Sequence, residues 1–270
     1  MKKAIRRIII ALIILFVVFC AATYFLTPFF MVHPNSSPDA VEELQSMPNV
    51  TEVEMDDGLM GWFIDDASSE DLIIYFGGNS ENASSAALRF INNQEYFDGF
   101  DIEIVDWPGY GLSKGYADSD SLRSCALAVL DYYSNVEGRI FVFGYSMGTG
   151  PAVYCTSRSD AVDGLVLMSP YASAYDLYNN QVNIFYGPFR LLLPFKMNSA
   201  DYAANVAITP LIITSKSDKL VPYASSIKLS GAFPNGAFVE EFNDLSHSEY
   251  WGSEEVLQAI RNYILRRPGP

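Results

Sequence analysis

The sequence predicts an α/β protein with a doubly wound, mostly parallel sheet, preceded by one helix long enough to cross a membrane. Three observations support this prediction. Short apolar runs alternate with longer segments of helical pattern along the 270 residues. A long uncharged stretch stands before that alternation, and a Gly-x-Ser-x-Gly motif stands in its middle. A chain of this length can bury one sizeable core, so we expect a single domain over residues 49–270.

The first element is the uncharged stretch 8–32, which follows a basic cluster made of Lys2, Lys3, Arg6 and Arg7. As a helix it would span roughly 37 Å at ~1.5 Å per residue, against about 30 Å for a hydrocarbon core. Residues 1–32 are therefore expected to form a single-pass signal anchor in the cell membrane. The positive-inside rule places the N-terminus in the cytoplasm and the rest of the chain outside it. Cleavage near Cys20–Ala22 would instead give a secreted protein.

Charge and composition exclude some classes of function. Outside the basic cluster, 13 basic residues face 32 acidic ones, a formal charge of −19, so nucleic acid is not expected as a partner. The cysteines and histidines lack metal-ligand spacing, so neither a metal nor a cofactor is expected. Cys125 and Cys155 fall in expected helices, where they can pair in an oxidising compartment or remain buried thiols.

Residues 33–48 are rich in Pro, Asn and Ser, and we expect a linker that spaces the domain from the membrane. The domain then opens with two strand-like segments, Val50–Met55 and Leu59–Ile64. They flank Asp56-Asp57-Gly58, a sequence typical of a tight hairpin.

Further strands are expected at apolar runs that suit burial on both faces: Leu72–Phe76, Ile102–Val105, Ile140–Phe143, Leu165–Met168, Leu211–Thr214 and Ala237–Phe242. Helical patterns lie between them at Asn82–Phe97, Ser119–Ser134, Thr149–Arg158, Tyr223–Gly231 and Glu254–Leu265. Residues 171–207 are too long and too aromatic for an idle loop. They are expected to form a short helical cap over the C-terminal edge of the sheet, where ligands bind in open α/β folds.

The motif Gly144-Tyr145-Ser146-Met147-Gly148 stands between an expected strand and an expected helix. In this context the serine occupies a sharp, strained turn that exposes its oxygen, and the glycines let neighbouring backbone approach closely. The helix directs its positive end at the site, and the backbone N–H of Met147 can donate to a developing oxyanion. Ser146 is the candidate nucleophile.

A serine nucleophile needs a base, and His247 is the histidine that follows Ser146 in the chain. Asp218 follows an expected strand and is the candidate for the carboxylate that orients the imidazole. Asp244 competes for that role, because it lies three residues before His247 and can bond it locally. The second oxyanion donor is expected to be the backbone N–H of Asn79, in the turn after Leu72–Phe76.

These residues resemble the α/β-hydrolase superfamily, and more narrowly its N-terminally anchored serine hydrolases of the abhydrolase-domain type. The resemblance covers about residues 50–267. It rests on Gly77-Gly78-Asn79, Pro108-Gly109-Tyr110-Gly111-x-Ser113, Gly144-x-Ser146-x-Gly148, Ser169-Pro170, Asp218-x-x-Val221-Pro222 and His247. The family usually has His-Gly where this chain has Gly77-Gly78, and a glycine where Ser246 precedes the histidine. The first departure bears on how the oxyanion loop is braced.

The resemblance implies a serine hydrolase that cleaves carboxylic esters or thioesters, such as acyl lipids or acylated proteins, through an acyl-enzyme. The expected partner is a small-molecule or lipid-like ester, and its binding residues cannot be assigned from the sequence. A serine peptidase would use the same three side chains. An anchored binding module would keep the fold without turnover.

Overall fold

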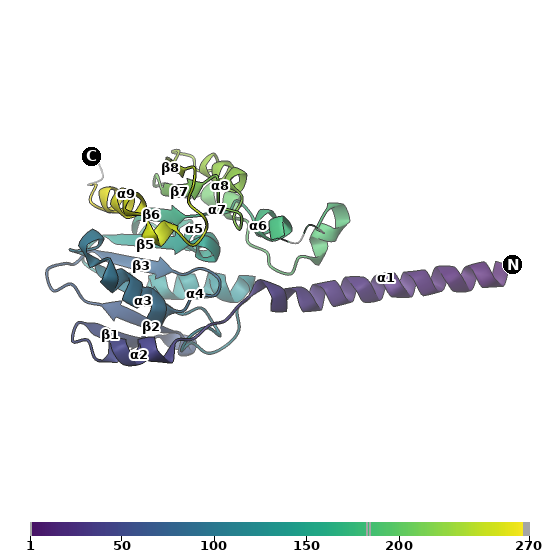
Figure 1. Cartoon of the computed structure of the whole chain (residues 1–270), viewed down its shortest axis with the longest axis horizontal. Helices are drawn as coiled ribbons and strands as arrows, with labels where there is room; N and C mark the ends of the chain where they lie inside the picture. The colour runs from purple at the N-terminus through teal and green to yellow at the C-terminus, as the bar shows by residue number, and fades with distance from the viewer. Residues whose placement is uncertain (1, 182, 184, 267–270) are drawn as a thin grey trace.

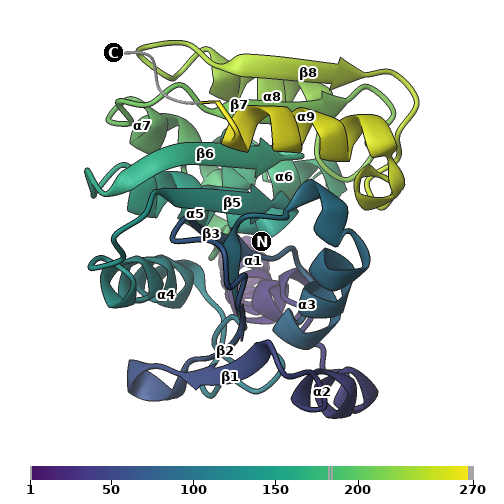
Figure 2. The ribbon, with the colours of Figure 1, turned by 90° about the vertical axis from the view of Figure 1, so that its left-hand side faces the viewer.

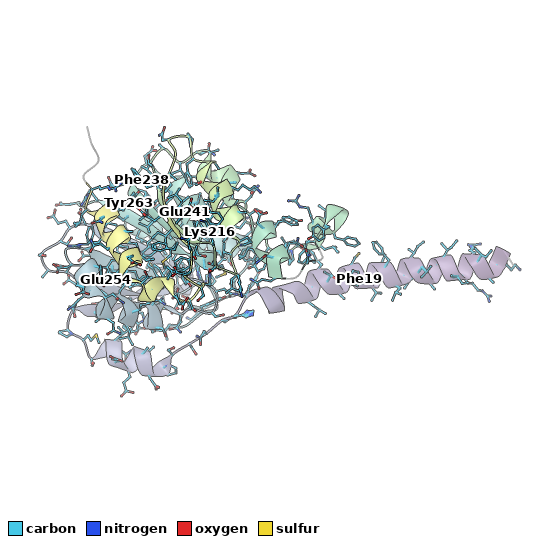
Figure 3. The ribbon with its side chains drawn as sticks, turned by 45° about the horizontal axis from the view of Figure 1, so that its top comes forward. Phe19, Lys216, Phe238, Glu241, Glu254 and Tyr263 are labelled. Carbon is cyan, nitrogen blue, oxygen red and sulfur yellow. The ribbon has the colours of Figure 1, made fainter. Side chains whose placement is uncertain are left out.

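Helix α1, Lys2–Met31, leaves the rest of the protein as one long rod in the computed structural model, which describes residues 2–181, 183 and 185–266 (Figure 1). Most of its side chains between residues 3 and 26 are exposed, among them that of Phe19, which is labelled in Figure 3. Residues Lys3–Leu26 have a mean hydropathy of 2.9, and none of this apolar window is buried. The helix therefore has the length and composition of a membrane span or of a signal sequence.

The domain is built on an eight-stranded sheet of order β1-β2-β4-β3-β5-β6-β7-β8. Strands β1 (Val50–Glu54) and β2 (Met60–Ile64) form an antiparallel hairpin, and β2 pairs antiparallel with β4 (Asp101–Val105). The other pairings are parallel. The strands that complete the sheet are β3 (Leu72–Phe76), β5 (Ile140–Tyr145), β6 (Val162–Met168), β7 (Leu211–Ser215) and β8 (Phe238–Phe242).

Helices cover both faces of this sheet. One apolar cluster joins it to α2 (Pro38–Gln45), α3 (Ala83–Asn92) and α9 (Glu254–Ile264), and Figure 2 shows α3 and α9 on the near face. The other cluster joins it to α4 (Ser119–Tyr132), α5 (Thr149–Thr156) and α8 (Tyr223–Ser230). The predicted doubly wound α/β architecture with an antiparallel hairpin is therefore confirmed.

The described residues also form short 3-10 turns: η1 (Asp56–Gly58), η2 (Gln94–Tyr96), η3 (Ser146–Gly148), η4 (Gly187–Leu192) and η5 (Tyr250–Gly252).

The apolar runs form strands within three residues of their predicted ends, but the burial of β8 differs from the prediction. It was expected to be buried on both faces, whereas Phe238 is 44% exposed and Glu240 and Glu241 face solvent. Strand β8 is the last in the sheet order, so it has a neighbour on one side.

Residues 33–48 do not form the free linker that their composition suggested. Helix α2 occupies most of the segment, with Ala40 and Leu44 buried against the domain. Pro38 stands in its first turn, where a missing N–H costs nothing. The chain after α1 is thus part of the folded domain.

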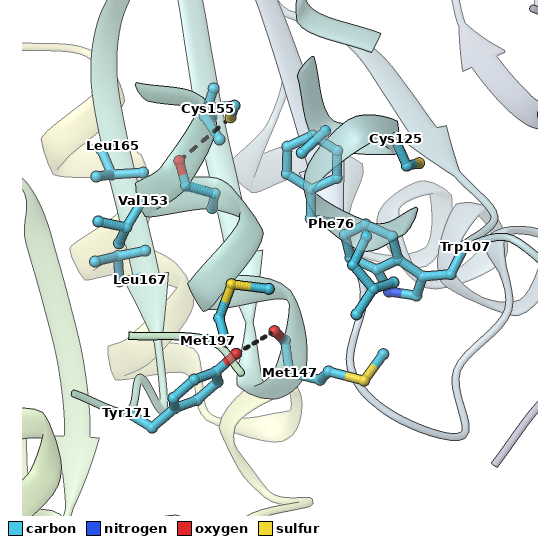
Figure 4. Packing of buried hydrophobic residues seen from close by; sticks show 14 of the residues in the cluster. Phe76, Trp107, Cys125, Met147, Val153, Cys155, Leu165, Leu167, Tyr171 and Met197 are labelled. Carbon is cyan, nitrogen blue, oxygen red and sulfur yellow. Dashed lines mark hydrogen bonds between the residues drawn. The ribbon is translucent and has the colours of Figure 1, made fainter. Parts of the chain in front are cut away.

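The segment between β6 and β7 contains α6 (Ala174–Gln181), η4 and α7 (Ser199–Ala203). Much of its aromatic content is buried in the same cluster as α4 and α5: Tyr171, Tyr178, Phe185 and Phe195. Figure 4 shows part of this packing, in which Tyr171 lies beside Met147 and Met197. In the same cluster Cys125 and Cys155 are buried free thiols, and burial raises their pKa values.

Candidate active site

Ser146 follows β5 directly and adopts φ 51°, the left-handed region that is strained for a residue with a side chain. Close backbone packing holds the turn. A Cβ on Gly148 would lie 2.1 Å from the carbonyl oxygen of Phe76, and one on Gly144 would lie 2.8 Å from that of Gly148. Both positions therefore require glycine, and the predicted strand, strained turn and helix are present.

His247 and Asp218 meet at the same end of the sheet. Asp218 lies just beyond β7, and its Oδ2 is 2.8 Å from Nδ1 of His247. The aspartate side chain is 1% exposed and the histidine side chain 16%. Asp244 is exposed, so the geometry favours Asp218 over its competitor.

Asp218 is held by more donors than the sequence suggested. Its Oδ2 also accepts hydrogen bonds from Ser169 Oγ at 2.6 Å and from the Tyr250 hydroxyl at 3.2 Å. Its Oδ1 accepts from the N–H groups of Leu220 and Val221 at 2.9 and 3.0 Å. Burial alone would raise the pKa of Asp218, but the hydrogen bonds and the charge of His247 outweigh burial and lower it. The carboxyl is therefore ionised when it faces the imidazole.

Tyr145 connects the histidine to the serine turn. Its ring stacks on the imidazole with centroids 5.3 Å apart, and its hydroxyl donates to the carbonyl oxygen of His247 at 2.6 Å. Burial raises the pKa of Tyr145, so the phenol stays a neutral donor. No hydrogen bond joins Ser146 Oγ to His247 among the described residues. Such bonds are commonly long in unliganded sites and tighten when substrate binds.

The two expected oxyanion donors belong to segments that border Ser146. Met147 is in the first turn of η3 and α5, where backbone N–H groups have no partner within the helix. Its carbonyl accepts a hydrogen bond from the Tyr171 hydroxyl, drawn as a dashed line in Figure 4. Across the site, a Cβ on Gly78 would lie 3.5 Å from Cβ of Ser146. The turn that contains Asn79 therefore borders the nucleophile.

Sequence reasoning missed the contacts of Ser169, Tyr250 and Tyr145. The sequence held one indication of the Ser169 contact. Ser169 and Asp218 each follow a parallel strand, and the ends of such strands meet at one edge of the sheet. Ser169 also has φ 53°, a second strained serine at this edge. No group of three or more His, Cys, Asp or Glu side chains within the described ranges is arranged to hold a metal ion.

The site lies in a chain whose residues 71–207, about half of its length, match the family model of the α/β hydrolase fold. The chain belongs to this family. Its relatives include an uncharacterized protein of Mycobacterium tuberculosis, 27% identical over an alignment of 223 residues that covers 78% of this chain and 77% of that protein.

Solved structures share the fold at low sequence identity. The esterase Pf2001 of Pyrococcus furiosus superposes with a TM-score of 0.69 at 18% identity, over 88% of this chain and 99% of that one. Est1E of Butyrivibrio proteoclasticus, solved with ferulic acid bound, superposes with a TM-score of 0.65 at 18% identity, over 80% and 98% of the two chains. These likenesses agree with the eight-stranded architecture.

Proposed function

We propose that this protein is a membrane-anchored serine hydrolase that cleaves carboxylic esters or thioesters. The observation that carries the proposal is the 2.8 Å pair of Asp218 and His247, which Tyr145 holds beside the strained turn of Ser146. A buried carboxylate on Nδ1 leaves the other imidazole nitrogen as a proton acceptor. Such an acceptor beside a serine in a strained turn at a helix start suits acyl transfer.

The chemistry follows from these positions. Ser146 Oγ attacks the acyl carbon while Nε2 of His247 takes its proton, and the carbonyl oxygen becomes an oxyanion between the N–H groups of Met147 and Asn79. The tetrahedral intermediate collapses as His247 returns the proton to the leaving alcohol or thiol. Water then attacks the acyl-serine, again through His247, and releases the carboxylic acid.

Two considerations support an ester or thioester as substrate. The solved structures of similar fold include the esterase Pf2001, and also Est1E, which was solved with ferulic acid bound. The segment between β6 and β7 supplies apolar side chains at the sheet edge beside Met147. A serine peptidase remains the alternative with the same three side chains, and substrate panels separate the two.

The membrane assignment rests on α1. Its apolar side chains between residues 8 and 26 are mostly exposed. Four basic residues precede the apolar stretch, which favours a cytoplasmic N-terminus. Phe189 of η4 contacts Phe16 of α1 edge to face, with ring centroids 6.2 Å apart. Figure 1 shows the segment around η4 reaching toward this helix. The segment between β6 and β7 therefore contacts the proposed anchor.

A fluorophosphonate probe tests the proposal on the full-length protein in detergent. The wild type should be labelled, and Ser146→Ala should not be, because the probe bonds covalently to an activated serine. Nitrophenyl esters of increasing chain length, matching thioesters and a peptide amide then define the substrate. Absence of labelling in a folded wild type would favour the inert binding module, and preferential cleavage of the peptide would favour the peptidase.

A further inference from the structure

The oxyanion loop, residues 77–80, has an unusual support. Where the family resemblance leads one to expect a histidine, this chain has Gly77, and the side chain of Glu81 lies beside it. A Cβ on Gly77 would lie 2.8 Å from Oε2 of Glu81, closer than real Cβ contacts. The Glu81 carboxylate therefore occupies the space that a side chain at position 77 would need.

Glu81 holds the loop through one peptide group. Its Oε2 accepts a 2.8 Å hydrogen bond from the N–H of Gly78. The carbonyl of the same peptide, on Gly77, accepts a 3.0 Å hydrogen bond from the indole N–H of Trp107. With both polar groups bonded, the plane of this peptide is fixed. The next N–H along the chain belongs to Asn79, the expected oxyanion donor.

The Glu81 carboxylate is itself held by two further side chains. The hydroxyl of Tyr75 donates to Oε2 at 2.8 Å, and the guanidinium of Arg89 pairs with Oε1. Arg89 in turn lies over the ring of Trp251, 4.5 Å from its centroid. The Glu81 side chain is 11% exposed, so these contacts lie mostly out of water and are weakly screened. Burial raises the pKa of Tyr75 well above its ordinary value, which keeps the phenol a donor.

We propose that Glu81 is a positioning residue for hydrolysis, fixing the Gly77–Gly78 peptide so that the Asn79 N–H is aimed at the oxyanion. This inference rests on the proposed function of Ser146. The hydrogen bonds of Glu81 go to Gly78, Tyr75 and Arg89 and not to Ser146, so we assign its effect on the transition state to the loop. A misdirected donor weakens binding of the transition state while ground-state binding changes little.

The test compares Glu81→Gln and Glu81→Leu with the wild type, on a short nitrophenyl ester and with the fluorophosphonate probe. Removing one oxyanion donor typically costs about 10²-fold or more in kcat, so misdirecting one in Glu81→Leu should cost ~10- to 100-fold. Glu81→Gln keeps an acceptor for Gly78 and should lose less. KM should stay within about 2-fold in both, and the rate of probe labelling should fall in parallel with kcat.

Glu103→Gln and Glu103→Leu are the matched controls, because Glu103 is another buried carboxylate of this sheet and does not touch the loop. They should retain wild-type kcat. Thermal midpoints identify any variant that fails to fold. If Glu81→Leu is one, Trp107→Phe takes its place, because it removes the hydrogen bond to the carbonyl of the same peptide. It should reproduce the loss in kcat. Unchanged kcat and labelling in folded Glu81→Gln and in the second folded variant would overturn the positioning role. A wild type that is not labelled would instead refute the proposed function.

Discussion

The hydroxyl of Tyr145 donates a 2.6 Å hydrogen bond to the carbonyl oxygen of His247, although 102 residues separate the two in the chain. The bond joins the residue before the candidate nucleophile to the backbone of the candidate base. Tyr145→Phe keeps the stacked ring and removes this bond. Since a net hydrogen bond is worth about 1 kcal/mol, kcat should fall ~5-fold with the fold intact. Steady-state kinetics on a nitrophenyl ester measure this, and an unchanged kcat would show that stacking alone places His247.

Replacing the carboxylate that orients His247 should be far more damaging. Asp218→Asn removes the charge that stabilises the imidazolium and disturbs the tautomer, so kcat should fall by roughly 10⁴. Asp244→Asn is the matched control, because Asp244 is an exposed carboxylate of the same histidine loop. It should leave kcat unchanged. If Asp244→Asn were the more damaging change, the assignment of the orienting residue would be wrong.

Ser169 should make a smaller contribution through Asp218. Ser169→Ala removes the 2.6 Å donor to Oδ2, and we expect a loss of ~3- to 10-fold in kcat, because the other donors remain. Ser169→Gly loses the same hydroxyl but relieves the strain of φ 53°. The two variants should therefore share one kcat and differ in thermal midpoint. Different kcat values would mean that backbone strain, and not the hydroxyl, supports the site.

Glu103 should make the stability of the protein depend on pH. Burial, only partly offset by a hydrogen bond from Tyr133, raises the pKa of Glu103 to about 8 in the folded protein. Between its ordinary value near 4.5 and about 8, the folded state keeps a proton that the unfolded chain has lost. This group therefore lowers stability as pH rises through that window, by at most about 1.4 kcal/mol per pH unit.

Glu103→Gln removes this titration. The free energy of unfolding of the variant, minus that of the wild type, should increase as pH rises from 5 to 8, by up to ~1.4 kcal/mol per pH unit. Urea unfolding of both proteins in detergent at several pH values measures the difference. A difference that is constant across the range would show that Glu103 is already ionised at low pH in the folded state.

The segment after α1 gives a prediction about truncation. The backbone N–H of His33 donates to Oδ1 of Asn79 at 2.9 Å, and the side-chain amide of Asn35 donates to the carbonyl of Ser80 at 3.1 Å. Deleting residues 2–31 keeps these bonds and should leave kcat on a short soluble ester within about 2-fold. Deleting residues 2–37 removes them and should cost ~10-fold in kcat, because the oxyanion loop loses its outer support. Equal kcat values in the two truncated proteins would show that the segment only links anchor and domain.

Much of the site could be predicted because each of its main residues stands in a recognisable local sequence pattern. Ser146 stands between a strong apolar strand and a helix, and parallel strands bring Asp218 and His247 to the same edge. Contacts between side chains that are distant in sequence leave no such pattern. The hydrogen bonds of Ser169 and Tyr250 to Asp218 are therefore visible only in the structure. Glu81 was missed because its role depends on the absence of a side chain at Gly77, whose space the Glu81 carboxylate occupies.

Helix α2 was missed for a different reason. Pro and Ser around residues 33–38 read as a linker, but Ser-Pro is also a common way to begin a helix, and Ala40 and Leu44 have the i, i+4 spacing of a buried face. The pattern is only two turns long, so it is weak beside the composition. Burial against α3 stabilises a helix that its own propensity would not.

The bond from His33 to Asn79 also sets a geometry for substrate delivery. His33 lies two residues beyond the end of α1, so at ~3.5 Å per residue the oxyanion loop is about 7 Å of chain from the end of that helix. With α1 as the proposed anchor, a site tied so closely to it should sample molecules that diffuse within or just above the lipid surface. Its turnover in a cell should then follow their density per membrane area rather than their bulk concentration.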